Sequence, residues 1–154
     1  MRLAFYHPEI PHNTGALLRV AACLGVPFDL IGPLGFVLSD RRLQRASMDY
    51  QDKAQFLIHA SFEMFLRSYP NARVVALIAK GNVPFTSFSF VPSDILLLGP
   101  ESTGLPMDIL QHTPHHVTIP MQRNTRSLNA AIAGSIVLAE ALRQCSMFPT
   151  GVVE

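Results

Sequence analysis

The sequence ILLLGPESTGLP at residues 95–106 joins an uninterrupted apolar run to a tight loop that contains two glycines and two prolines. Four consecutive apolar residues at 95–98 are typical of a strand in a parallel sheet whose two faces are both covered. Residues 73–79 form a second run of this kind. Because such runs alternate with helical patterns along the chain, we predict an α/β fold with a mainly parallel sheet flanked by helices.

The other apolar runs predict strands at residues 3–6, 28–31, 56–58 and 117–119. Helical patterns occupy residues 13–24, 40–45, 61–66, 107–110 and 127–144. Asn13 or Thr14 can cap the first of these helices, Gly25 can end it, and Ser61 can cap the third. These elements alternate without an internal repeat, which predicts a single domain over residues 1–154.

The composition points to a folded chain that does not work alone. Hydrophobic residues make up 49% of the 154 residues and charged residues only 15%, which excludes intrinsic disorder. The last predicted helix, residues 127–144, is apolar almost all round. Either it is a core helix packed closely against the sheet, or one of its faces also packs on the same helix of a second subunit. We favour the second interpretation and expect a homodimer.

Charge and cysteine content narrow the class of protein further. The net charge of +1 argues neither for nor against nucleic acid. All basic residues except Lys53 and Lys80 are arginines, which suit phosphate groups, although genomic GC bias also favours arginine. Two cysteines do not make a disulfide framework, and no apolar stretch is long enough for a signal sequence or a bilayer span. We therefore expect a cytoplasmic protein that makes no membrane contact.

The loop at residues 99–106 follows the carboxyl end of a buried strand, where α/β proteins bind ligands. It has neither the Gly-Lys-Ser/Thr ending of a Walker phosphate loop nor the Gly-x-Ser-x-Gly pattern of a nucleophile elbow. The loop is thus either a structural turn or a ligand-binding loop. Glu101 favours the ligand-binding interpretation, because a carboxylate beside a tight glycine turn has few structural reasons to be there.

Two further groups of residues stand at helix starts. Ser127 can be a simple N-cap of the last helix, whereas Asn129 places an amide in the first turn of an apolar helix and requires a partner. Arg19 lies among apolar residues of the first helix, so its head either points into a site or extends outward. The histidines show no metal-ligand spacing beyond the adjacent pair His115 and His116, so we expect no metal site.

In this order, these groups resemble the three motifs of the SPOUT superfamily of RNA methyltransferases. The closest resemblance is to the minimal tRNA (cytidine/uridine) 2′-O-methyltransferases, which modify the wobble nucleotide of the anticodon. The residues that carry the three motifs are Asn13-Thr14-Gly15 with Arg19, then 97–106, then 119–121 with Ser127-Leu128-Asn129. Residues 6–11, Arg45-Ala46, Asp49-Tyr50 and Lys80-Gly81 are also similar to that subfamily.

The resemblance implies a deep trefoil knot in the C-terminal third, an obligate homodimer, and S-adenosylmethionine as cofactor. The cofactor site that it implies consists of Leu77, Gly99, Ile119, Met121, Ser127 and Leu128. The catalytic residues that it implies are Asn13, Arg19, Glu101, Ser127 and Asn129.

The substrate implied by the resemblance is tRNA, and the reaction is methylation of a ribose 2′-oxygen. We expect Arg19 to bind a phosphate and stabilise the developing alkoxide, because a guanidinium does not release its proton near neutral pH. Glu101 would orient Arg19 or another donor, while Ser127 and Asn129 would position the ribose.

RNA contacts are expected from Arg41, Arg42 and Arg45. The alternative for this cluster is a solvated helix face paired with Asp40 and Asp49.

Two positions depart from the subfamily pattern, and three other functions stay open. Thr103 stands where the subfamily often has arginine, and residues 130–132 lack the polar side chains of some relatives. The alternatives are a ribosomal RNA methyltransferase, a non-catalytic RNA-binding dimer module, and a flavodoxin-like nucleotide-binding protein. The last is disfavoured because the helix starts lack a phosphate-loop pattern.

Overall fold

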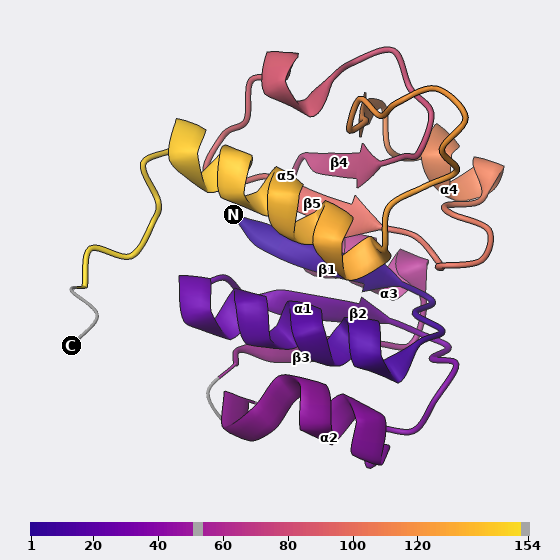
Figure 1. Cartoon of the computed structure of the whole chain (residues 1–154), viewed down its shortest axis with the longest axis vertical. Coiled ribbons are helices and arrows are strands. Elements are labelled where there is room, and N and C mark those ends of the chain that lie inside the picture. Colours follow the sequence, from indigo (N-terminus) through magenta and orange to yellow (C-terminus); the bar gives the residue numbers. More distant parts are fainter. Residues whose placement is uncertain (51–53, 152–154) are drawn as a thin grey trace.

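The computed structural model describes residues 1–50 and 54–151. They form a parallel sheet whose strands follow the spatial order β3-β2-β1-β5-β4-β6, with every neighbouring pair parallel (Figure 1). The strands are β1 (Arg2–Tyr6), β2 (Phe28–Ile31), β3 (Phe56–His59), β4 (Val74–Leu77), β5 (Ile95–Leu98) and β6 (His115–Val117). The predicted α/β fold with a parallel sheet flanked by helices is confirmed.

Helices cover both faces of this sheet. Those of the described residues are α1 (Pro11–Leu24), α2 (Arg41–Ser47), α3 (Phe62–Ser68), α4 (Met107–Gln111) and α5 (Ala130–Gln144), with short 3₁₀ turns at Met48–Tyr50 and Phe85–Ser87. Helices α1 and α5 lie side by side on one face, and α2 packs on the far side of α1 (Figure 1). Helices α3 and α4 cover the opposite face. No helix among the described residues is long and apolar enough to cross a bilayer.

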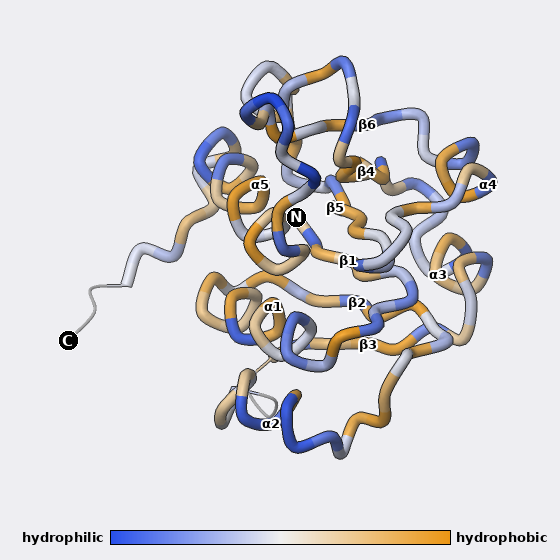
Figure 2. The backbone as a smooth tube through the Cα atoms, turned by 45° about the vertical axis from the view of Figure 1, so that its right-hand side comes forward, coloured by the Kyte–Doolittle hydropathy of each residue, from blue (hydrophilic) through white to orange (hydrophobic). Residues whose placement is uncertain are grey.

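The central strand β5 shows why its sequence is apolar at every position. Leu96 and Leu98 belong to the core beneath α1 and α5, whereas Ile95 and Leu97 belong to the core beneath α3 and α4. Successive side chains of a strand point to opposite faces, so both sets must be apolar when both faces are covered. Figure 2 shows β5 as an apolar segment inside the molecule. Close packing continues at Gly134 of α5, where an added Cβ would lie 3.1 Å from Leu98 Cδ1.

Most predicted element boundaries differ from the structure by one to three residues, and three of these differences lie near the carboxyl edge of the sheet. Helix α1 begins at Pro11, whose fixed φ suits a first turn, so Asn13 lies inside the helix and does not cap it. Helix α5 begins at Ala130, because the Asn129 side chain accepts hydrogen bonds from two backbone N–H groups of the first turn. Ser127 is therefore not the cap. Strand β6 ends at Val117, two residues before the predicted end, since beyond it the chain pairs only through an isolated bridge between Thr118 and Pro84.

Candidate functional site

A cavity of about 510 Å³ opens at the carboxyl ends of β4, β5 and β6, beside the start of α5. Its wall comes from four separate parts of the chain: the start of α1, residues 77–79, residues 98–104 and residues 117–137. A volume in the range of roughly 300–1,000 Å³ is typical of small-molecule sites, and the carboxyl edge of a parallel sheet is the usual place for one. The cavity is therefore the candidate ligand site.

The residues predicted to bind a cofactor all line this cavity. They are Leu77, Gly99, Ile119, Met121, Ser127 and Leu128. The first four are partly buried, whereas the last two are exposed and lie at the opening. An apolar wall with backbone groups from a glycine turn suits the adenine ring of S-adenosylmethionine. These residues thus fit the group that the motifs implied.

Gly99 has a specific reason to be glycine. A Cβ at this position would lie 2.4 Å from the Leu105 nitrogen and 2.6 Å from the Gly104 carbonyl carbon. Both distances are too short for a real contact, so the loop would have to move to admit the Cβ. Gly104, in the same loop, has open space around it but a φ of +70°. The two glycines of this loop therefore serve different needs, one for close approach of backbone and the other for a left-handed conformation.

Three of the predicted catalytic residues meet at the rim of the cavity. Asn129 Nδ2 donates to Asn13 Oδ1 at 2.8 Å, and Asn13 Nδ2 donates to Glu101 Oε1 at 3.2 Å. Asn129 Oδ1 caps α5 at the same time. Both amides are thereby oriented, and the partner expected for Asn129 is a residue 116 positions away in the chain.

Glu101 has a structural role that the sequence interpretation missed. Its carboxylate accepts hydrogen bonds from the backbone N–H groups of Glu9 (2.8 Å) and Ile10 (3.1 Å). Ile10 is the N-cap residue of α1 and has no side chain that can cap it. Glu101 therefore supplies an acceptor and a negative charge at the start of α1, where both are favourable. The premise that a carboxylate here has few structural reasons is wrong.

A reciprocal contact between the same two loops was also missed. The Glu9 carboxylate accepts hydrogen bonds from Ser102 Oγ at 2.7 Å and from the Ser102 backbone N–H at 2.8 Å. These hydrogen bonds lower the pKa of Glu9, the one from the Ser102 side chain most strongly. The two residues are 93 positions apart, so no local spacing in the sequence could have indicated the pair.

Arg19 does not line the cavity of its own chain. It is exposed on α1, and its guanidinium carbon lies 5.7 Å from the centre of the Tyr50 ring. The donors that the Glu101 side chain does contact are the Asn13 amide and two backbone N–H groups. Within one chain, Glu101 therefore does not orient Arg19. It contacts another donor, the Asn13 amide, instead.

The arginines predicted to contact RNA lie on α2, apart from the cavity. Arg42 is held by Asp40, with Nε–Oδ1 at 3.1 Å and Nη2–Oδ2 at 2.8 Å, and this contact lowers the pKa of Asp40 to about 2. Arg41 and Arg45 are exposed and have no carboxylate partner within the described part of the chain, which leaves out the Asp49 side chain. The alternative interpretation, a solvated helix face whose arginines pair with acidic residues, therefore applies to Arg42. Among the described residues, no group of three His, Cys, Asp or Glu side chains could hold a metal ion.

Comparison with known sequences shows that the chain is similar to RNA methylases. The chain matches the SpoU rRNA Methylase family over residues 1–139. A tRNA (cytidine(34)-2'-O)-methyltransferase of Beijerinckia indica subsp. indica is 46% identical over 145 residues, which cover 92% of this chain and 90% of that protein. The protein of the same name from Escherichia coli (strain K12) is 38% identical over 146 residues, covering 94% and 93%.

Solved structures agree with these relationships. A structure that concerns 2-OH methylation of C/U34 on tRNA matches with a TM-score of 0.89 at 44% identity, covering 93% of this chain and 94% of that chain. The SpoU methyltransferase AviRb of Streptomyces viridochromogenes, in complex with the cofactor AdoMet, matches with a TM-score of 0.82 at 26% identity. It covers 94% of this chain and 60% of that chain.

Proposed function

This chain belongs to the SpoU rRNA methylase family, and from that premise we propose that it methylates the ribose 2′-hydroxyl of the wobble nucleotide, cytidine or uridine 34, of tRNA. The methyl donor is S-adenosylmethionine. Relatives named for this reaction cover nine tenths or more of this chain and of their own length. The observation that carries the proposal is the cavity at the carboxyl edge of β4, β5 and β6, which all six predicted cofactor residues line.

When bound, S-adenosylmethionine supplies an electrophilic methyl group, and the chain's task is to position the attacking oxygen and to manage its charge. Asn13, Glu101 and Asn129 form a fixed polar rim through hydrogen bonds of 2.8 and 3.2 Å. Ser127 lies in the exposed loop at the opening, where its hydroxyl can contact the ribose. Arg19 stabilises the developing alkoxide and binds a nearby phosphate, and the proton passes to a phosphate or to water.

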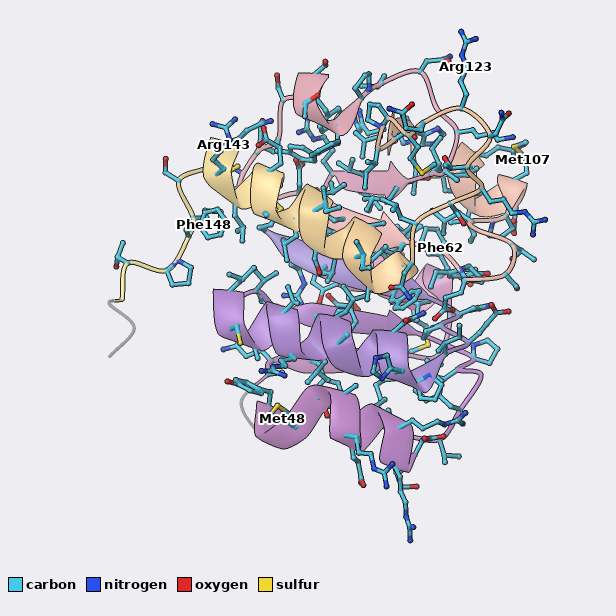
Figure 3. The ribbon with its side chains drawn as sticks, viewed as in Figure 1. Met48, Phe62, Met107, Arg123, Arg143 and Phe148 are labelled. Carbon is cyan, nitrogen blue, oxygen red and sulfur yellow. The ribbon has the colours of Figure 1, made fainter. Side chains whose placement is uncertain are left out.

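We further propose that two copies of the chain assemble through the outer face of α5. The outer face of α5 leaves Ile132 54% and Ile136 38% exposed. Beyond α5, Phe148 is 43% exposed and projects from the end of the helix (Figure 3). Apolar residues gathered on one uncovered helix face are typical of a subunit interface.

Besides the dimer, the proposal includes the deep C-terminal knot, a single domain and a cytoplasmic location.

The dimer also gives Arg19 a place in the reaction. Arg19 does not line the cavity of its own chain, and it extends from the exposed side of α1, the helix that packs beside α5. We infer that Arg19 serves the cavity of the partner subunit. Arg19→Ala should then abolish turnover and leave cofactor binding nearly intact, and loss of cofactor binding would contradict the assignment.

Co-expression of two variants, assayed at an S-adenosylmethionine concentration at which neither is active alone, tests this arrangement. Arg19→Ala lacks the proposed catalytic residue, and Gly99→Ala disturbs the proposed cofactor turn. If Arg19 acts across the interface, a mixed dimer contains one complete site, and random pairing should restore about a quarter of the wild-type activity. If Arg19 acts within its own subunit, no mixed dimer has a complete site and the mixture should be inactive.

Gly25→Ala, at the end of α1 and outside the lining of the cavity, is the matched control for Gly99→Ala. It meets no atom within 4 Å, so it should cost about 1 kcal/mol of stability through its left-handed φ and leave cofactor affinity close to wild type. Gly99→Ala should weaken cofactor binding by at least about ten-fold, because the loop must shift to admit the methyl group. Calorimetric titration with S-adenosylmethionine measures both.

Incubation of the purified protein with bulk tRNA and methyl-labelled S-adenosylmethionine, followed by nucleoside mass spectrometry, tests the reaction itself. The expected product is a 2′-O-methylated cytidine or uridine derivative that maps to the wobble position. Label on ribosomal RNA alone would keep the chemistry and replace the substrate. Measurable cofactor binding without label on any RNA would contradict the enzymatic proposal and favour a non-catalytic RNA-binding dimer.

A further inference from the structure

A second cavity lies beside the first and is not explained by cofactor binding. It has a volume of about 980 Å³ and lies between residues 78–83, which follow β4, and residues 114–126, which flank β6 and extend beyond it. We call it the basic cleft. Both segments leave the carboxyl edge of the sheet from neighbouring strands, so the cleft shares the edge at which α/β proteins bind their ligands.

Thr118 ties the two walls of the basic cleft together. Its backbone N–H donates to the Val83 carbonyl at 3.0 Å, and its Oγ1 donates to the Ala79 carbonyl at 3.2 Å. Its own carbonyl accepts from the Phe85 N–H at 2.9 Å. Thr118 thus makes three hydrogen bonds, two as donor and one as acceptor, and these hold the two walls of the cleft in a fixed position relative to each other.

The charge of the cleft is one-sided. Lys80, Arg123 and Arg126 line it, and its lining contains no Asp or Glu. Within residues 1–50 and 54–151, these three cations have no hydrogen-bond or ion-pair partner. Figure 3 shows Arg123 extending from its loop into solvent.

Arginines elsewhere in the described chain are mostly neutralised. The ones that contact a carboxylate are Arg2, Arg42, Arg67, Arg73 and Arg143. Arg19, Arg41 and Arg45 also lack a carboxylate partner among the described residues, but only the basic cleft gathers three such cations around one cavity, and such a cavity attracts a polyanion.

The basic cleft and the cofactor cavity share a wall. Ile78, Ala79, Ile119, Met121 and Arg126 line both. A chain-like anion that lies in the cleft would therefore run directly into the rim at which the methyl group is transferred. The polar residues beside the cations, Asn82, Gln122, Asn124 and Thr125, can donate hydrogen bonds to phosphate oxygens.

We propose that the basic cleft binds the phosphodiester backbone of the RNA substrate next to the target ribose, through Lys80, Arg123 and Arg126. This proposal rests on the proposed function and specifies where the substrate lies. It adds an RNA surface to the arginines of α2, at a place where no carboxylate competes for the cations.

Binding of a fluorescently labelled tRNA anticodon stem-loop by the full-length protein, measured by anisotropy over a range of salt concentrations, tests the proposal. Lys80→Ala and Arg123→Ala should each weaken RNA binding about three- to ten-fold and reduce the salt dependence by about one phosphate contact. Arg67→Ala is the matched control, because it also removes one positive charge but from an exposed ion pair on α3. It should bind RNA as the wild type does.

The outcomes separate this proposal from the proposed function. Unchanged S-adenosylmethionine affinity in Lys80→Ala and Arg123→Ala, together with weaker RNA binding and a smaller salt slope, supports the basic cleft. If the wild type methylates tRNA while these variants bind the stem-loop with wild-type affinity and slope, the cleft is not the RNA site and the function stands. An equal loss in Arg67→Ala would show a general charge effect and overturn the cleft as a specific site. A wild type that neither binds nor methylates tRNA overturns both proposals.

Discussion

Two carboxylates of this chain each have three hydrogen-bond donors but lie in opposite surroundings. Asp29 on β2 is fully buried and accepts from Arg2 Nε at 2.8 Å and Tyr69 OH at 2.9 Å, with His59 Nε2 at 2.8 Å as its third partner. Glu101 accepts from the Glu9 and Ile10 N–H groups and from Asn13. The first cluster is closed by the sheet and α3, whereas the second opens onto the proposed cofactor cavity.

The number of partners therefore does not distinguish a structural carboxylate from one at a site. What differs is what surrounds the cluster. Removal of a partner from the Asp29 cluster leaves a buried group without compensation, and the cost falls on folding. Water can reach the Glu101 cluster, so a change there should affect the geometry of the rim more than the stability of the fold. The following predictions test this division, in order of decreasing effect.

Asp29→Ala should have the largest effect. It leaves Arg2, His59 and Tyr69 without their common acceptor, and breaking a buried charged cluster typically costs about 3–5 kcal/mol of unfolding free energy. Urea denaturation measures this value. Glu63→Ala, which removes an exposed i,i+4 pair with Arg67, is the control and should cost about 0.3–0.5 kcal/mol. Equal losses in the two variants would refute a distinct role for the buried cluster.

Glu101→Gln should lower the unfolding free energy by about 2 kcal/mol, because one of the two oxygens that accept a backbone N–H is replaced by an NH₂ donor. Unlike Asp29→Ala, it should also weaken cofactor binding, since Glu101 joins the loop at 99–104 to the start of α1. Denaturation and cofactor titration of the same preparation measure the two effects. Full cofactor affinity with lost stability would place Glu101 with Asp29 as purely structural.

Asn129 separates helix capping from the rim. Asn129→Asp keeps an acceptor for the first turn of α5 but loses the amide that donates to Asn13, whereas Asn129→Ala loses both. We expect Asn129→Ala to cost about 1 kcal/mol of stability, and Asn129→Asp to cost less than that. Both variants should lose methyl transfer in a single-turnover assay. Wild-type turnover in Asn129→Asp would show that Asn129 acts only as a cap.

The pH dependence of stability reports on the Asp29 cluster without a change in packing. Burial, together with the hydrogen bond to Asp29, raises the pKa of Tyr69 to about 12. A raised pKa means that the stabilising contribution is complete below the ordinary value of about 10 and is lost as the pH rises toward 12. The unfolding free energy should therefore fall less steeply over this range in Tyr69→Phe than in the wild type. Phenolate absorbance of Tyr69→Phe should lack the last titration step, and an unchanged step would contradict the assignment.

The sequence by itself predicted those elements that depend on neighbours in the chain. The strands at 28–31 and 95–98 have the predicted limits, because a run of apolar residues is a local signal. Gly25 ends α1 with a left-handed φ of 66°, and the Ser61 side chain accepts from the Met64 N–H at the start of α3, both as predicted. The lining of the cavity by the six predicted cofactor residues followed from a resemblance in motifs, not from periodicity.

Only the tertiary structure decided which polar groups meet. Glu101 and Ile10 are 91 positions apart, Glu9 and Ser102 are 93 apart, and Asn13 and Asn129 are 116 apart. In a parallel sheet, crossover connections return each strand to the same edge, so loops from distant parts of the chain come together there. Local propensity carries no information about these distances. For that reason the sequence could name the residues of the rim, whereas the acceptor at the start of α1, the buried partners of Asp29 and the unpaired cations of the basic cleft depend on the fold.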